Sequence, residues 1–297
     1  MQVERYDFFL LISATRFTKN DTWLGNEITK MHRKYFFVRT KVGADIYSNT
    51  KAYPRTHNEE TVLSTIRKNA EKHLKEYGCE STPVFLVDSY MPMKFSFKEL
   101  EQKLINDFPE LKKSAMILSM CAFSEEMIRL KASELRSRIW KVATASAVVA
   151  AVPAPGVSAI FDTAVVLYEV NFYFKQLALD DDSLRRHAAL TKTDYNKLKS
   201  IVDQESLATF LTAEGLTEVA RHLPKTAATC ASMAIEEVSR YIPFFGSAIA
   251  APLSFATTYY MLKFVLDKLE KVAMEVVTYA AENDRSLDDE GEDGDNQ

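Results

Sequence analysis

Three short apolar runs, each followed by a helical pattern, constrain the fold of this 297-residue chain more than any other feature. The runs are Tyr6 to Ser13, Tyr35 to Val38 and Val84 to Val87, and they are rich in aromatic and β-branched residues. Continuous apolar runs of this length are typical of strands buried on both faces of a parallel sheet. The alternation of strands and helices therefore predicts an α/β domain in residues 1–113.

Start and stop signals mark the segments between these runs. Thr56 and Ser96 are each followed three residues later by glutamate, the spacing of a capping box at a helix N-terminus. The second run ends at Thr40 and Lys41, where we expect a loop. In an open parallel sheet, ligands bind at the carboxyl ends of the strands. The loop after the second run is therefore a candidate binding element.

Strand signals cease at Ser114, and we expect an all-helical domain over residues 114–282. It contains two uncharged stretches, Val142 to Phe161 and Tyr241 to Leu262. Each is broken by a Pro-x-x-Gly turn, at Pro153 and Gly156 and at Pro243 and Gly246. As one helix the second stretch would be about 33 Å long, enough to cross a bilayer, but Pro and Gly shorten it. Buried hairpins are favoured over membrane spans, and peripheral membrane contact stays open.

Composition excludes several classes of function. Lys and Arg number 37 against 41 Asp and Glu, so the net charge of −4 gives no general attraction to nucleic acid. The three cysteines are far apart and the five histidines lack metal-site spacing, which indicates reduced thiols of an intracellular protein and no metal site. The acidic tail, residues 283–297, is expected to be disordered.

Thr40 and Lys41 resemble the guanine-specificity loop of GTPases, which is usually Thr/Asn-Lys-x-Asp. In that loop the lysine stem lies along the purine face, and the carboxylate accepts two hydrogen bonds from the guanine edge. Gly43 stands where that acid would be, and Asp45 comes two residues too late to be a simple substitute. Loss of a charged bidentate contact costs about 3 kcal/mol or more, on the order of a hundredfold in affinity.

Further stretches share this resemblance, and they extend over almost the whole chain in consistent order. They are YDFFLLISATRF at Tyr6 to Phe17, KYFFVRTKV at Lys34 to Val42, VFLVDS at Val84 to Ser89, VPAPG at Val152 to Gly156, LDDDSL at Leu179 to Leu184 and IPFFGS at Ile242 to Ser247. The chain thereby resembles the immunity-related, interferon-inducible GTPases, a dynamin-like family. The resemblance implies an α/β plus α protein, in which the C-terminal half of a Ras-like P-loop GTPase sheet precedes an all-helical domain.

The resemblance also implies binding residues and partners. Thr40 and Lys41 match the guanine loop, and Asp88 and Ser89 fall in the family's next guanine-contacting loop, which carries a Ser-Asn type sequence. The implied cofactors are GTP or GDP with Mg²⁺. The implied partners are copies of the chain or related GTPases, in the cytoplasm and at intracellular membranes, in cell-autonomous defence.

The phosphate-binding signatures of nucleotide-binding proteins are missing from this sequence. None of the eight glycines lies in a GxxxxGK[ST] or GxGxxG pattern. We interpret residues 1–113 as a GTPase domain without its phosphate-binding half, and we predict that the isolated chain does not hydrolyse GTP. The alternative is a non-catalytic interaction or regulatory protein that acts on membranes or on full-length GTPase relatives.

Overall fold

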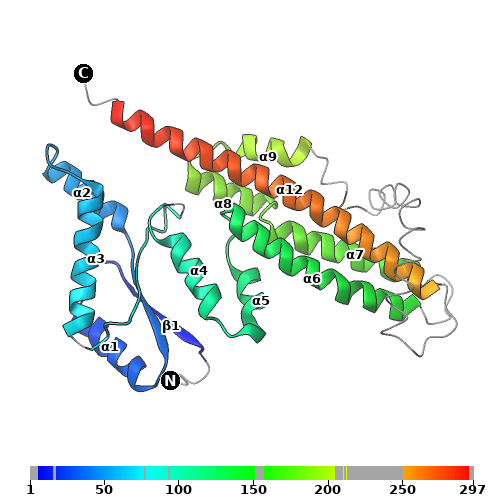
Figure 1. The fold of residues 1–297 in the computed structure, drawn as a ribbon. Coiled ribbons are helices and arrows are strands. Elements are labelled where there is room, and N and C mark those ends of the chain that lie inside the picture. Colours follow the sequence, from blue (N-terminus) through cyan, green and yellow to red (C-terminus); the bar gives the residue numbers. More distant parts are fainter. Residues whose placement is uncertain are drawn as a thin grey trace. The chain divides into compact units, whose positions relative to one another are not determined.

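The computed structural model describes residues 6–15, 18–76, 78–92, 94–150, 157–204, 210, 212 and 250–293. The chain divides between Met116 and Ile117 into two compact units. The first unit contains the strands, and the described part of the second contains helices but no strand (Figure 1). An α/β unit followed by a helical unit agrees with the fold class expected from the sequence.

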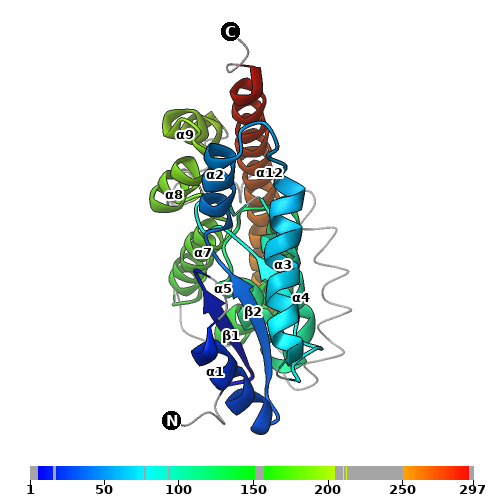
Figure 2. The ribbon, with the colours of Figure 1, turned by 90° about the vertical axis from the view of Figure 1, so that its left-hand side faces the viewer.

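A three-stranded parallel sheet forms the centre of the first unit. Its strands are β1 (Phe8–Ser13), β2 (Lys34–Arg39) and β3 (Val84–Leu86), in the order β1-β2-β3. Figure 2 shows β1 and β2 side by side. All three predicted strands are thus confirmed, and β2 is the central one because it pairs with both neighbours.

Both faces of β2 are covered by apolar side chains. On one face Tyr35 and Phe37 belong to a buried cluster that includes Ala70 and Leu74 from a helix. On the other face Phe36 packs edge-on against Phe85, with 5.8 Å between ring centroids. Burial on both faces explains why the strand is a continuous apolar run and does not alternate with polar residues.

Five helices alternate with the strands or follow them in the sequence, and the last crosses the boundary between the two units. They are α1 (Lys19–Lys30), α2 (Val42–Ala52), α3 (Glu59–Glu76), α4 (Phe97–Asp107) and α5 (Glu110–Ser119). Helix α2 was not predicted, and the expected loop after β2 is reduced to Thr40 and Lys41. The sequence VGADIYSNTKA contains apolar residues, but they do not recur along one helical face, so it gives no periodic signal. Its start is fixed by Val42, which is completely buried.

The predicted capping boxes are wrong in detail. At α3 the amide of Thr61 donates to Oδ1 of Asn58 over 2.8 Å, so Asn58 and not Thr56 caps the helix. Ser96 immediately precedes α4, but its side chain does not cap the helix and accepts instead from the Arg67 guanidinium at 3.0 Å. Asparagine and threonine are both preferred N-cap residues, and only the position of Asn58 directly before α3 distinguishes it from Thr56.

The helical unit contains five described helices. They are α6 (Glu125–Ala150), α7 (Val157–Gln176), α8 (Asp181–Thr191), α9 (Tyr195–Gln204) and α12 (Ala250–Asp293). Helix α12, orange to red in Figure 1, lies along α6 and α7. Their shared core includes Leu135, Val170 and Leu266, all fully buried. Glu169 is also buried in α7, and Arg138 of α6 pairs with it through bonds of 2.9 and 2.7 Å.

The two Pro-x-x-Gly motifs lie in the sequence between the described helices. Pro153, Gly156, Pro243 and Gly246 lie outside the described residues. Within the described part of the chain, no helix is both long and apolar enough to cross a membrane. Helix α12 continues to Asp293, into the acidic segment of residues 283–297 for which we predict disorder.

A buried histidine gives the helical unit a pH-dependent stability. His187 in α8 stacks on Phe123 with 5.4 Å between ring centroids, and its Nε2 is buried without a hydrogen-bond partner. Burial lowers the pKa of His187 from 6.5 to about 4. The folded state therefore keeps the ring neutral, and the unfolded chain takes up a proton as pH falls through 6.5.

We predict that this unit loses about 2 kcal/mol of unfolding free energy between pH 7 and pH 5, and that His187→Phe removes most of that loss. Urea unfolding can be followed by Trp140 fluorescence in a Trp23→Phe background, because the chain has only two tryptophans. An equal loss in both proteins would show that other groups cause the pH dependence.

Candidate functional site

Two turns meet at the carboxyl edge of the sheet. Thr40 and Lys41 follow β2, and Asp88 and Ser89 follow β3. The ladder continues past the strand ends, because the amide of Val87 donates to the Arg39 carbonyl over 2.8 Å. The four residues expected to contact guanine therefore come from two adjacent turns.

The carboxylate of Asp88 connects these two turns. Its Oδ2 accepts a hydrogen bond from the amide of Gly43 at 3.1 Å. Its Oδ1 accepts from the amide of Tyr90 at 3.0 Å. The residue is only 6% exposed, so these two donors replace part of the hydration that the carboxylate loses on burial.

Gly43 provides the space that Asp88 uses. A Cβ atom built on Gly43 would lie 2.9 Å from Oδ2 of Asp88 and 3.5 Å from Sδ of Met91. Real Cβ atoms essentially never approach another heavy atom as closely as 2.9 Å. The carboxylate of Asp88 thus lies where a side chain at position 43 would begin.

Lys41 is exposed and has a left-handed backbone, with φ at 60°. Thr40 is fixed beside it, because its amide donates to the Ser13 carbonyl over 2.9 Å. On the second turn Ser89 is exposed and Tyr90 is 80% exposed. The buried carboxylate of Asp88 is therefore accompanied by accessible residues from both turns.

Asp45 has a different role. Its Oδ2 pairs with Nη2 of Arg39, a buried residue at the end of β2. Nη1 of Arg39 also donates to the Ala14 carbonyl over 2.7 Å. Asp45 thus neutralises a buried guanidinium, which agrees with the expectation that it does not replace the missing acid at position 43.

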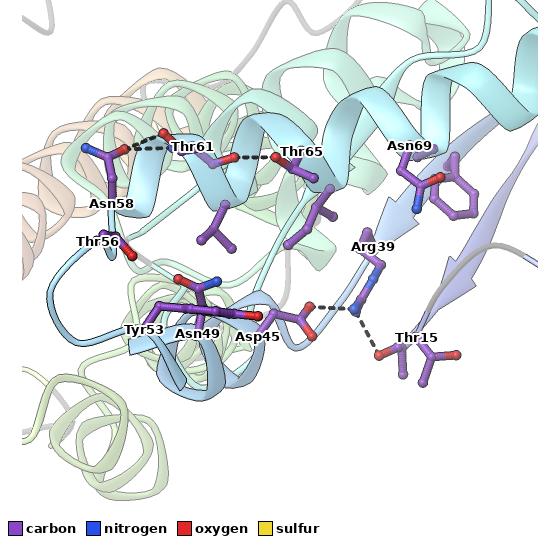
Figure 3. Close-up of a pocket in the computed structure, with 15 residues that line it drawn as sticks. Thr15, Arg39, Asp45, Asn49, Tyr53, Thr56, Asn58, Thr61, Thr65 and Asn69 are labelled. Carbon is purple, nitrogen blue, oxygen red and sulfur yellow. Dashed lines mark hydrogen bonds and ion pairs between the residues drawn. The ribbon is translucent and has the colours of Figure 1, made fainter. Parts of the chain in front are cut away.

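Arg39 and Asp45 also form part of the wall of a cavity of about 630 Å³ (Figure 3). Most of its polar lining is neutral, and Asn49, Tyr53, Thr61 and Asn69 are among the contributors. Lys41, Asp88 and Ser89 do not belong to its described lining. Six of its fifteen described lining residues come from α3 and two from α2, and no local sequence pattern indicates that these segments enclose a space. Among the described residues, no cluster of His, Cys, Asp or Glu could hold a metal ion.

A parallel sheet with polar turns at its carboxyl edge, followed by a helical unit, defines an α/β plus α protein. Residues 1–276 match the family model described as Interferon-inducible GTPase (IIGP). The chain belongs to the interferon-inducible GTPase family.

Individual relatives agree with this assignment. Interferon-inducible GTPase 5 of Rattus norvegicus is 31% identical over 282 residues, which cover 95% of this chain and 60% of the relative. The Bos taurus protein of the same name is 31% identical over 98% of this chain and 63% of its own length. Interferon-gamma-inducible GTPase 10 of Mus musculus is 30% identical over 92% of this chain and 62% of its own length. The chain thus spans about three fifths of these relatives.

The contact between the turns can be tested without any ligand. We predict that Asp88→Ala speeds hydrogen exchange at the amides of Gly43 and Tyr90, because both lose their acceptor. Removing the acceptor of these two amides also lowers the unfolding free energy by about 1 kcal/mol. Exchange measured by NMR checks this, with Ser89→Ala as the matched control. Unchanged exchange in Asp88→Ala would contradict the hydrogen bonds described.

Proposed function

We propose that the first unit forms the base-binding part of a guanine-nucleotide site in a GTPase of the interferon-inducible family. Thr40 and Lys41 contact the purine from one turn, and Asp88 and Ser89 contact it from the other. The observation that carries the proposal is the link between Gly43 and Asp88, which holds the two turns together. The sheet would then correspond to the C-terminal half of a Ras-like domain.

Phosphate binding and hydrolysis require more than these turns. Phosphoryl transfer depends on backbone amides and a lysine around the phosphates, with a serine or threonine on Mg²⁺. The sequence contains no GxxxxGK[ST] motif that would supply them. We therefore assign no residue here to phosphate or Mg²⁺, and we propose that these 297 residues alone bind GTP or GDP without turnover.

The second candidate function is that of a non-catalytic interaction or regulatory protein. Strand β1 pairs with β2 on one side, and no described strand pairs with its other side. Leu10 and Ile12 of β1 are 39% and 59% exposed. An open edge with apolar side chains favours addition of a strand from another chain. This supports association with copies of the chain or with related GTPases. The family resemblance alone suggests the cytoplasm, or peripheral contact with intracellular membranes, as its place.

Fluorescence titration with labelled GDP and GTP in magnesium buffer tests the first proposal. We predict saturable binding that unlabelled GTP competes away, and a loss of about tenfold or more in Lys41→Ala. Lys51→Ala is the matched control, because Lys51 is an exposed lysine of α2 outside both turns. A demonstrably folded chain that binds no nucleotide up to millimolar concentration would leave the interaction protein as the function.

A further inference from the structure

The acid that position 43 lacks is present on the neighbouring turn. We propose that Asp88 supplies the carboxylate that recognises guanine in this chain, from the turn after β3 and not from the turn after β2. The proposal rests on the guanine-nucleotide function proposed above, and it names the residue that sets base specificity at that site.

The first argument is the shared space. The carboxylate oxygen of Asp88 lies 2.9 Å from the point where a Cβ atom of residue 43 would be. An aspartate at position 43 would begin at that point, so its carboxylate and that of Asp88 would be crowded together with like charges. Glycine at position 43 therefore leaves room for the carboxylate of Asp88. Asp88 in turn places an acid next to the backbone of residue 43, where the guanine loop of GTPases usually has its aspartate.

The second argument is hydrogen-bonding capacity. An ionised carboxylate has about four acceptor positions, and the amides of Gly43 and Tyr90 use one on each oxygen of Asp88. One position remains on each oxygen. Guanine presents two adjacent donors on one edge, N1–H and the 2-amino group, which match two acceptors. Adenine has no such pair of donors, so the ligand class is a guanine nucleotide.

The third argument is preorganisation. Two backbone amides fix the orientation of the carboxylate, so little conformational freedom is lost when a base binds. The group is nearly removed from water, where hydrogen bonds to a charged acceptor are strong. Asp45, the other acid close to these turns, is paired with Arg39. Lys41 and Tyr90 are exposed on the two turns, so their side chains are available to cover the faces of a bound purine.

The unmodified chain provides the first test. In competition against labelled GDP, we predict that IDP binds about tenfold more weakly than GDP, because inosine lacks the 2-amino donor. XDP should bind more weakly still, because xanthine places a carbonyl oxygen against the carboxylate in place of that donor. Equal binding of GDP and IDP would overturn the assignment of Asp88.

A variant then assigns the effect to Asp88. In Asp88→Asn the side-chain amide can donate to the xanthine carbonyl and accept from N1–H, although it loses the hydrogen bond from one of the two backbone amides. Both diphosphates should then bind more weakly than GDP binds the unmodified chain, but the order should invert, with XDP exceeding GDP by about tenfold. Asp45→Asn is the matched control and should keep the order of the unmodified chain. In Gly43→Asp/Asp88→Ser the acid moves to the other turn, and the preference for GDP should return.

The outcomes separate this inference from the proposed function. If GDP binds and Asp88→Asn keeps the original preference, another group recognises the base and only the inference fails. If a folded chain binds none of the three diphosphates, the inference and the proposed function both fail. Circular dichroism establishes whether Asp88→Asn folds, and if it does not, the ratio of IDP to GDP affinity in the unmodified chain decides.

Discussion

The hydrogen bonds of one buried carboxylate hold together the edge of the sheet where the candidate site lies. Asp88 accepts from the amides of Gly43 and Tyr90, and so joins the start of α2 to the turn after β3. A buried carboxylate without such donors would be costly, so the two turns and the acid depend on one another. Glycine at position 43 is part of the same constraint, because a side chain there would displace the carboxylate.

Much of the fold could be predicted from the sequence because its strands are buried on both faces. Burial of that kind demands continuous apolar runs, and the run containing Phe36 and Phe37 is the central strand β2. Helix α2 could not be predicted in this way, since its burial is concentrated at one residue, Val42. The cap of α3 was misplaced because Thr56 and Asn58 have similar capping preferences and only the backbone path selects between them.

The candidate site could be predicted only in part. Thr40, Lys41, Asp88 and Ser89 were chosen by resemblance, and adjacent parallel strands bring their turns together. The sequence showed an acid missing at position 43 and an acid present at position 88 as two unconnected facts. Their connection is a contact between residues 45 positions apart, and no local pattern encodes a contact of that kind. The ion pair of Arg39 with Asp45 was hidden for the same reason, since α2 itself was not expected.

The most direct test of this account is a ¹H–¹⁵N NMR titration of the chain with GDP. If the base binds between the two turns, the largest chemical-shift changes should occur at the amides of Lys41, Gly43 and Tyr90. The backbone amides of residues that line the cavity of Figure 3, such as Asn69, should change little. Saturable changes confined to that cavity, with Gly43 and Tyr90 unmoved, would contradict the account and place the ligand elsewhere.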